Sequence, residues 1–455
     1  MSFEWPVYSL NEVCLKITDG AHQSPKSVLV GKPMASVKDL TRFGVQLSSA
    51  RKISVEDYEA LVKQGCRPNV GDVLIAKDGN SALDTVCSVD EPLDAVLLSS
   101  VAILRPDPKV VDSHFLRHYL SSPDTIDYLK TNFISGAAIP RVVLRDFKKA
   151  EIRLPNLVTQ RAIAKILDSL DDRIKLLGET NVTLEAIAQA LFKSWFVDFD
   201  PVRAKMEGRV PEGMDEATAA LFPDGLEESE LGAVPKGWNL VPFGQLLSHT
   251  IGGDWGSDAP EEKNDTRVAI IRGTDIPDLQ SGANSRVPIR YTSLKKLATR
   301  RLEDGDIVLE VSGGSKDQPT GRALYLTNGL LGQFDCPVEP ASFCRLLRPS
   351  HKGIGVVLGQ HLTYIYAQGK TWEYQNQSTG IANFQTVHFL ETELVVVPSN
   401  DILTAFVDMV RPLIERTHLT QIQDLSNLRD TLLPRLISGQ LRLSDVEKQI
   451  EAIAA

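Results

Sequence analysis

The sequence predicts an α+β protein in which two mostly β domains are separated by a long antiparallel two-helix coiled coil. Three observations predict this fold: an internal repeat, short β-branched segments in each copy, and an apolar heptad pattern after the first copy. A chain of 455 residues is long enough for two to four domains. The predicted parts are domain one (1–155), a central coiled-coil helix (156–200), a linker (201–232), domain two (233–398), and a C-terminal coiled-coil helix with a tail (399–455).

The repeat consists of weak matches that occur in the same order in both halves. EWPVYSLNEV from Glu4 matches GWNLVPFGQL from Gly237, SVKDL matches RGTDI, VGDVLIAKDG matches DGDIVLEVSG, and LRDFKKAEIRLP matches VHFLETELVVVP. A helix then follows each copy directly, after Pro155 and after Pro398. The conserved order indicates a pseudo-two-fold molecule.

Each copy contains short β-branched runs, among them GDVLIA, AVLLSSVAILRP, GDIVLEV, RALYL and SFCRLLRP. Gly, Asp, Asn and Pro separate these runs, which is typical of strands joined by turns. A helical segment from Ser113, SHFLRHYLSSPDTIDYLKT, is expected to interrupt the first copy. We therefore expect mostly β domains with short helices.

The helix after Pro155 carries an apolar seam with alternating spacings of four and three residues. Its members are Ile163, Leu167, Leu170, Ile174, Leu177, Asn181, Leu184, Ala188, Leu191 and Trp195. This spacing predicts a coiled-coil helix from Thr159 to Phe196, roughly 57 Å long. The polar Asn181 is expected to fix its register. The partner is expected in the second helix, which carries two apolar runs. The first is Phe406, Val410, Leu413 and Thr417, and the second is Leu425, Leu432 and Leu436. The phase of the pattern slips by about two residues between the two runs.

Charge and cysteine content limit the functional classes. The net charge is −10, but residues 1–155 carry 19 basic and 19 acidic side chains and residues 233–398 carry 16 and 17. Neither domain is therefore a broad basic surface, and a partner is expected to supply most of the positive field that phosphates require. The five cysteines form no C-x-x-C pair, which favours reduced thiols over structural zinc. With neither a secretion signal nor a run of 18 apolar residues, the protein is expected to be cytoplasmic and to span no membrane.

The sequence contains none of several common catalytic motifs. The sequence lacks a P-loop, H-E-x-x-H, G-x-S-x-G and the Asn/Asp-Pro-Pro-Tyr/Phe tetrad of amino-methyltransferases. Asp306 and Glu310 lie close together, but no lysine follows at nuclease spacing, so we expect a strand with an exposed acidic start. A binding module is favoured over an enzyme, and no metal or cofactor is expected on this chain.

Polar, glycine-containing loops are the best candidates for a binding site. The loops at 16–27, 76–81 and 134–141 of the first copy correspond to those at 249–258, 310–318 and 376–385 of the second. The framework around these loops is shared between the copies, but their side chains differ. Short hydrogen-bond donors and acceptors on a glycine-containing backbone suit contacts with the edges of DNA bases. For any single residue, an ordinary surface turn is an equal alternative. The candidate DNA-binding residues are Thr18, Asp19, His22, Gln23, Ser24, Lys26, Lys77, Asn80, Ser135, Arg141, Trp255, Ser312, Ser315, Lys316, Gln377, Ser378, Asn383 and Gln385.

The sequence resembles the specificity subunits of type I restriction-modification enzymes over nearly its whole length. The segment LPNLVTQRAIAKILDSLDDRIKLL, continued by LFKSWFVDFDPVRAKMEG and LFPDGLEESELGAVPKGW, is similar to the central region and second-domain entry of that family. ITDGAHQSP, GDVLIAKDG and LLPRLISGQL fit the same family.

The resemblance implies a subunit of bacterial defence with two target recognition domains, each reading one half of a split site in double-stranded DNA. It implies that the helices bind two methyltransferase (modification) subunits, which carry S-adenosylmethionine for DNA methylation. Restriction subunits with ATP and Mg²⁺ would perform translocation and cleavage, and this chain would be non-catalytic. Apolar surface around Phe192, Trp195, Phe196 and Phe199 is expected to contact a partner subunit, the alternative being packing on the segment DPVRAKMEGRVPEG.

Two other functional classes compete with this interpretation. One is a stand-alone, duplicated nucleic-acid-processing enzyme such as a nuclease or lyase, which activity assays on the isolated chain would detect. The other is an RNA-binding or structural protein, which competition between duplex DNA and RNA would separate from a DNA reader.

Overall fold

The computed structural model describes residues 5–136, 140–230, 232–283, 286–315, 318–378, 381–441 and 443. The chain folds into two compact units, one made of Met1–Lys175 with Leu425–Ala455 and the other of Leu176–Asp424. Helix α6 (Leu157–Phe196) begins in the first unit and ends in the second. Each unit therefore contains one copy of the repeat and part of the helical regions, while the domain limits predicted from the sequence stay a prediction.

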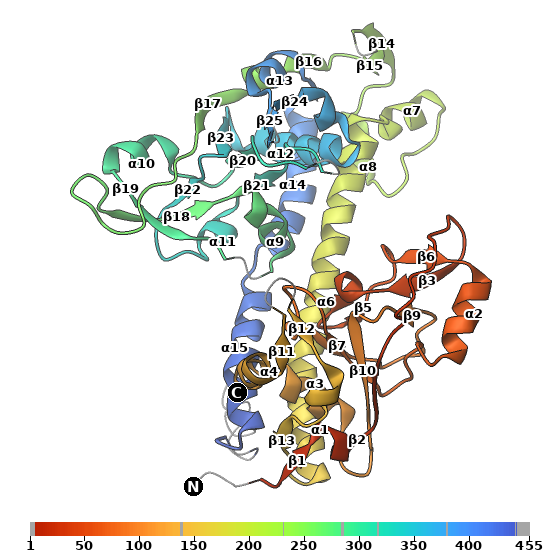
Figure 1. Cartoon of the computed structure of the whole chain (residues 1–455). Coiled ribbons are helices and arrows are strands. Elements are labelled where there is room, and N and C mark those ends of the chain that lie inside the picture. The colour runs from red at the N-terminus through yellow and green to blue at the C-terminus, as the bar shows by residue number, and fades with distance from the viewer. Residues whose placement is uncertain are drawn as a thin grey trace. The chain divides into compact units, whose positions relative to one another are not determined.

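The first unit is built on a four-stranded antiparallel sheet in the order β2–β10–β7–β8 (Figure 1). Its strands are β2 (Cys14–Asp19), β7 (Val73–Ala76), β8 (Val86–Ser88) and β10 (Val101–Pro106). A smaller sheet, β6–β3–β9, contains β3 (Lys32–Ala35), β6 (Arg51–Ile53) and β9 (Val96–Leu97), with β3 and β9 parallel. The other elements are β1 (Val7–Ser9), α1 (Leu10–Val13), η1 (Val37–Asp39), β4 (Leu40–Thr41), β5 (Gly44–Val45), α2 (Val55–Lys63), α3 (Ser113–Leu120), α4 (Pro123–Phe133), β11 (Ile134–Ser135), β12 (Arg141–Val142), α5 (Leu144–Phe147) and β13 (Glu151–Arg153).

The second unit repeats this topology. Its four-stranded sheet has the order β17–β23–β20–β21, with β17 (Leu247–Gly252), β20 (Ile307–Glu310), β21 (Ala323–Tyr325) and β23 (Cys344–Pro349). Its three-stranded sheet has the order β19–β18–β22, with β18 (Thr266–Ile271), β19 (Ile289–Thr292) and β22 (Val338–Pro340), and β18 and β22 are parallel. The other elements are β16 (Asn239–Pro242), η2 (Phe243–Leu246), η3 (Gly273–Asp275), α9 (Ile276–Ser281), α10 (Leu294–Arg300), α11 (Asn328–Leu331), α12 (Lys352–Ala367), η4 (Lys370–Tyr374), β24 (Gln375–Ser378), β25 (Ile381–Phe384), α13 (Thr386–Thr392) and β26 (Leu394–Val397).

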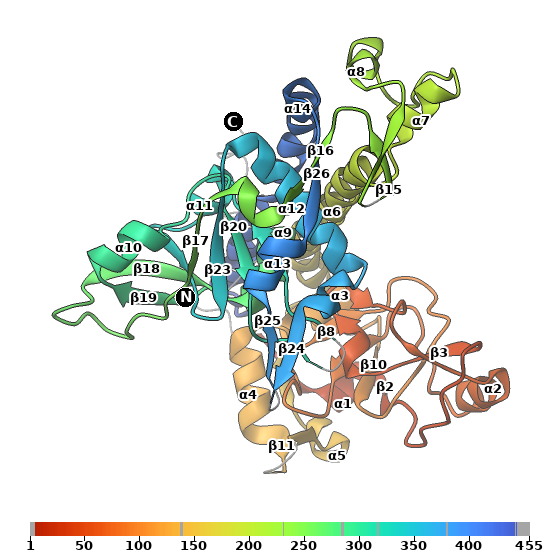
Figure 2. The ribbon, with the colours of Figure 1, turned by 90° about the horizontal axis from the view of Figure 1, so that it is seen from above.

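The two sheet orders confirm the internal repeat and the α+β fold class. The pairs β1–β13 and β11–β12 recur as β16–β26 and β24–β25, and Figure 2 shows the β24–β25 ribbon of the second unit. The segment from Ser113, expected as one helical stretch, forms two helices, α3 and α4. The chain turns at Ser121–Ser122, and Pro123 stands in the first turn of α4, where its missing N–H costs nothing.

The aspartate of the matched Gly-Asp turn is buried in each copy. Asp72 is contacted by Arg105 through two hydrogen bonds of 2.8 Å, and Asp306 by Arg348 at 2.9 and 2.8 Å. The expectation of an exposed acidic start at Asp306 and Glu310 is therefore wrong, since each is only 2% exposed. The arginine partners explain this, because a two-pronged guanidinium contact stabilises a carboxylate away from water.

Helix α6 packs antiparallel to the C-terminal helices within each unit. In the first unit Asp171 of α6 contacts Arg429 of α15 (Gln421–Ile437) at 3.0 Å, and Figure 1 shows the two helices side by side. In the second unit the Asn181 side chain donates to the Thr417 carbonyl at the end of α14 (Asn400–Thr417), while Trp195 packs on Phe406 with ring centroids 5.5 Å apart. The predicted seam of α6 is confirmed, because all its members are buried or half-buried.

In the described part of the C-terminal region the chain forms two helices, α14 and α15, rather than the single helix expected within 399–455. The chain leaves α14 at His418, whose buried ring is hydrogen-bonded to Thr327 Oγ1 at 2.8 Å, and α15 begins at Gln421. The break between α14 and α15 thus coincides with the buried His418, and the break accounts for the slip in apolar phase. Its surroundings also lower the pKa of His418 to about 4, because burial disfavours the charged ring.

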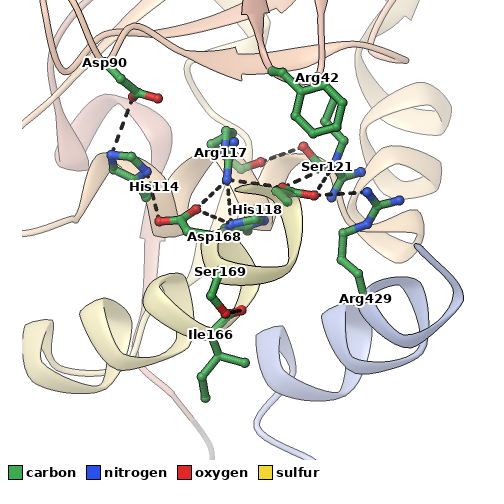
Figure 3. Close-up of polar contacts among 12 residues, drawn as sticks. Arg42, Asp90, His114, Arg117, His118, Ser121, Ile166, Asp168, Ser169 and Arg429 are labelled. Atoms are coloured by element: carbon green, nitrogen blue, oxygen red, sulfur yellow. Dashed lines mark hydrogen bonds and ion pairs between the residues drawn. The ribbon is translucent and has the colours of Figure 1, made fainter. Parts of the chain in front are cut away.

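An ion-pair network holds α3, α6 and α15 together in the first unit (Figure 3). Asp171 contacts Arg42, Arg117 and Arg429 at 3.2, 3.3 and 3.0 Å. Asp168 contacts Arg117, His118 and His114 at 2.5, 2.8 and 3.1 Å. Two aspartates on one face of α6 therefore fix its contacts with α3, with α15 and with Arg42 in the β4–β5 turn.

The predicted linker, 201–232, is mostly structured. It contains α7 (Asp200–Met206), α8 (Glu216–Leu221) and the hairpin of β14 (Leu226–Ser229) and β15 (Gly232–Pro235). Val202 and Phe222 from this segment are buried in the core of the second unit. The segment is therefore part of that unit's packing.

Candidate nucleic-acid interface

The three predicted loops of the first unit meet where β2 and β7 end. Each is held by backbone hydrogen bonds: Gly20 N–H to Val101 O (3.2 Å), Ala21 N–H to Leu97 O (2.7 Å), Lys77 N–H to Ser100 O (2.8 Å), Val142 N–H to Lys77 O (3.0 Å) and Gly79 N–H to Pro140 O (2.9 Å). We call this set the loop frame. It brings residues from 16–27, 76–81 and 134–141 together although they are far apart in the sequence.

The second unit has the same loop frame at the equivalent residues. The bonds are Gly253 N–H to Cys344 O (2.9 Å), Asp254 N–H to Pro340 O (3.0 Å), Val311 N–H to Phe343 O (2.9 Å), Phe384 N–H to Val311 O (2.8 Å) and Gly313 N–H to Ala382 O (3.3 Å). The first glycine of each set is sterically required: a Cβ would lie 2.1 Å from the Leu97 oxygen at Gly20 and 2.2 Å from the Pro340 oxygen at Gly253. The backbone of the loops is thus shared between the units.

The exposed side chains on the two frames differ. In the first unit, seven of the predicted residues are exposed: His22, Gln23, Ser24, Lys26, Asn80, Ser135 and Arg141. In the second unit, Trp255, Ser315, Asn383 and Gln385 are exposed and Ser312 is half-buried. Gln377 and Ser378 lie in β24, and Lys316 lies outside the described residues. The frame therefore presents different donors and acceptors in the two units.

Three predicted residues of the first unit, Thr18, Asp19 and Lys77, are less exposed than the other seven. Thr18 is half-buried, and Lys77 is 6% exposed with its ammonium 2.7 Å from the Asp19 carboxylate. The Asp19 side chain is itself 13% exposed and also contacts His22 at 3.2 Å. Together with burial, the negative charge of Asp19 raises the pKa of the nearby Cys66 thiol, burial being the larger effect.

The structure adds three residues to the interface that the sequence did not single out. Arg51 donates to Ser24 Oγ at 2.8 Å and to the Pro25 carbonyl at 2.9 Å, which holds the first loop. Asp78 contacts Arg141 at 3.3 Å. Arg290 lies over the Trp255 ring at 4.6 Å and is also paired with Asp258. These contacts join residues that are distant in the sequence, so local composition carried no signal for them.

The second frame has a buried charge pair of its own. Arg322 donates to Glu310 at 2.8 and 2.5 Å, and these hydrogen bonds raise the pKa of Arg322. Glu310 is the first residue of the second loop (310–318), and Arg322 follows that loop. The hydrogen bond from Glu310 N–H to Arg322 O corresponds to the one from Ala76 N–H to Thr85 O in the first unit. Ala76 and Thr85 therefore occupy the equivalent positions, and both are uncharged.

The four aromatic residues expected to contact a partner subunit are buried within the second unit. Phe192, Trp195, Phe196 and Phe199 are 1%, 2%, 4% and 7% exposed. Phe196 packs on Phe406 with centroids 4.7 Å apart, Trp195 on Phe222 at 4.9 Å, and Phe199 on Trp238 at 6.0 Å. The expectation of exposed apolar surface at these rings is corrected, because helix α14, the second copy and the segment after α6 cover them.

Within the described ranges, no cluster of three or more His, Cys, Asp or Glu side chains could hold a metal ion. The five cysteines are free, and Cys66, Cys87 and Cys344 are buried. Burial raises the pKa of Cys87 and of Cys344 to about 12. No helix in the described part of the chain is long and apolar enough to cross a membrane.

Comparisons with known proteins agree with this geometry. Residues 4–186 match the family described as "Type I restriction modification DNA specificity domain". The chain is 26% identical to the Type I restriction enzyme HindI specificity subunit of Haemophilus influenzae, over 96% of this chain and 100% of that protein. It is 26% identical to the Type I restriction enzyme MjaIX specificity subunit of Methanocaldococcus jannaschii, over 74% of this chain and 71% of that protein.

A solved structure shares the fold. It is the crystal structure of the type I restriction-modification system S subunit from M. genitalium, with a TM-score of 0.51, 16% identity, and coverage of 95% of this chain and 96% of that one. The sheets and loop frames thus define a protein of two similar copies. The family that residues 4–186 match is one of DNA specificity domains. The chain is therefore similar in sequence to type I restriction-modification specificity subunits, and similar in fold to a solved one, which confirms the resemblance inferred from the sequence.

Proposed function

We propose that this chain recognises a bipartite double-stranded DNA site, with one loop frame reading each half-site. The observation that carries the proposal is the shared backbone frame with different exposed side chains in the two units. A common frame presents loops to the same kind of ligand, while different hydrogen-bonding groups select different base edges.

The chain itself would contribute recognition and assembly, and no catalysis. Two methyltransferase subunits carrying S-adenosylmethionine would modify the site, and restriction subunits would use ATP and Mg²⁺. The near-neutral recognition domains support this division, because unaided phosphate binding depends on a surplus of Lys and Arg that residues 1–155 and 233–398 lack. The aromatic cluster of the second unit is buried, so it is not proposed as the surface that binds the partner subunits.

The test is selection from a library of randomised DNA duplexes by the full chain assembled with its modification subunits. We expect two short specified segments separated by an unspecified one. Arg141→Ala should relax only one segment, and Asn383→Ala only the other, each by about 1–3 kcal/mol if a bidentate base contact is lost.

Matched controls come from the same chain. Arg145→Ala removes an exposed arginine four residues from Arg141, and Asn239→Ala removes an exposed asparagine on β16, away from the loops. Neither control should change the selected sequence. Enrichment of a single undivided segment, or relaxation of both segments by Arg141→Ala, would contradict the two-reader model.

Methylation, ATP hydrolysis and cleavage assays on the isolated chain test the alternative of a stand-alone enzyme. We expect no turnover, and methyl transfer by the chain alone would overturn the proposed division of labour. Preference for RNA over duplex DNA in competition would instead favour an RNA-binding protein.

A further inference from the structure

Lys77 occupies the point where the three loops of the first unit meet. Its backbone N–H donates to Ser100, its carbonyl accepts from Val142, and its ammonium lies 2.7 Å from Asp19. Lys77 lies in the second loop (76–81). It contacts the segment after β9 through Ser100, the end of the third loop through Val142, and the first loop (16–27) through Asp19.

The side-chain contact is buried at both ends. The side chains of Lys77 and Asp19 are 7% and 13% exposed. An ammonium in this position is desolvated, so its carboxylate partner is needed to stabilise it, and removal of one partner leaves an unpaired buried charge. A lysine so placed is poorly situated to reach a phosphate or a base edge, which demand an extended and exposed side chain.

The second unit keeps the backbone part of this arrangement without the side-chain part. Val311 takes the place of Lys77, with the same two backbone hydrogen bonds, and Gly252 takes the place of Asp19. A different charge pair, Glu310 with Arg322, joins the two ends of the second loop there. The backbone frame is therefore common, whereas the buried charge pair that fastens the loops is particular to each unit.

We propose that the Asp19–Lys77 pair is a positioning device that determines specificity: it fixes the first loop against the second, and so sets which half-site the first unit reads without touching DNA. Glu310 and Arg322 do the same within the second loop of the other unit. This inference rests on the proposed function and assigns Lys77 a role different from the base or phosphate contact expected from the sequence.

The test uses the full chain assembled with its modification subunits, the library of randomised duplexes, and binding measured across a range of salt concentrations. Lys77→Met and Asp19→Asn are the disrupting variants, and Lys77→Arg is the conservative one. Lys149→Met, which removes a cation with a 72% exposed side chain from the same unit, is the control. Arg322→Met is the corresponding change in the second unit.

We expect Lys77→Met and Asp19→Asn to reduce the preference for the first half-site by roughly tenfold, the size of one mismatched base pair. The preference for the second half-site should be unchanged, and Lys77→Arg should restore most of the first. The dependence of log affinity on log salt should keep its slope, because no phosphate contact is lost. Arg322→Met should alter the second half-site alone.

Two results would overturn the inference. One is an unchanged first half-site preference in both disrupting variants. The other is a salt slope shallower by about 1 in Lys77→Met with the sequence preference kept, which would make Lys77 a phosphate contact. If Lys77→Met does not fold, Asp19→Asn and Lys77→Arg carry the test. If the unaltered assembly selects no sequence at all, the proposed function fails instead.

Discussion

Replacement of Glu339 by glutamine should remove a pH-dependent weakness of the second unit. Glu339 lies on β22, is fully buried, and neither of its carboxylate oxygens has a hydrogen-bond partner among the described residues. Burial, with a smaller contribution from the charge of Asp254, raises the pKa of Glu339 to about 7, although Arg300 and Lys296 oppose the shift. The equivalent residue of the first unit is Val96. Val96 of β9 lies opposite Met34 of the parallel strand β3, as Glu339 of β22 lies opposite Ile270 of the parallel strand β18.

The sign and size of the effect follow from proton linkage. Below pH 4.5 the carboxyl is protonated in both the folded and the unfolded state, and between 4.5 and about 7 it is protonated only when folded. The free energy of unfolding therefore falls as pH rises through this window, and the loss is complete above pH 7. The difference between the two pKa values corresponds to about 3 kcal/mol, of which about 2.5 kcal/mol falls between pH 5 and pH 8.

The assay is urea denaturation of the full chain with and without Glu339→Gln, from pH 5 to pH 8. Hydrogen exchange of peptides covering β18 and β22 would localise the effect, with β3 and β9 of the first unit as an internal control. Relative to the unaltered chain, the variant should gain about 2.5 kcal/mol in stability from pH 5 to pH 8. Glu339→Val, which copies the first unit, should show the same pH trend. A stability difference that does not change with pH would refute the reasoning.

Three further changes test contacts within single units. Gly282→Ala should destabilise the second unit by more than the roughly 1 kcal/mol that a positive φ costs, because the new Cβ would lie 2.6 Å from the Thr417 oxygen. Urea denaturation measures the loss. Gly369→Ala is the control, since Gly369 has φ +74 but its Cβ would meet no atom nearer than 3.6 Å. Asp171→Asn should lower the free energy of unfolding by about 3–5 kcal/mol and speed hydrogen exchange in α15, since it removes the carboxylate shared by three arginines. Asp172→Asn, at an exposed position, is the control and should change neither. Asp306→Asn should cost about 2–4 kcal/mol by weakening the contact with its arginine, with hydrogen exchange faster in β20 and unchanged in β7.

Local patterns were sufficient for the repeat, the strands and the helix α6. The heptad seam predicted α6 from Thr159 to Phe196, and the observed helix is Leu157–Phe196, because apolar spacing along one segment depends only on that segment. The matched Gly-Asp turns were visible for the same reason: Gly71 and Gly305 have φ of +87 and +93, a conformation that favours glycine at any such turn.

The candidate site was only partly accessible to sequence reasoning. The loops and their correspondence followed from composition and order, and the resemblance to specificity subunits followed from the motifs around α6. Side-chain placement did not follow: Lys77, predicted to contact DNA, is buried on Asp19, a residue 58 positions earlier. Likewise the rings around Phe196 look exposed when α6 is considered alone.

The sequence by itself determined the duplication, the positions of several strands along the chain and the length of α6, since periodicity and turn chemistry are properties of contiguous residues. Tertiary structure alone decided which polar groups are exposed, where the C-terminal helix breaks, and which charges meet. The His418 ring, just after the end of α14, is buried against Thr327, and Asp306 and Glu310 are buried in contact with Arg348 and Arg322. Burial and charge pairing depend on residues brought together from distant parts of the chain, and only the folded arrangement specifies those partners.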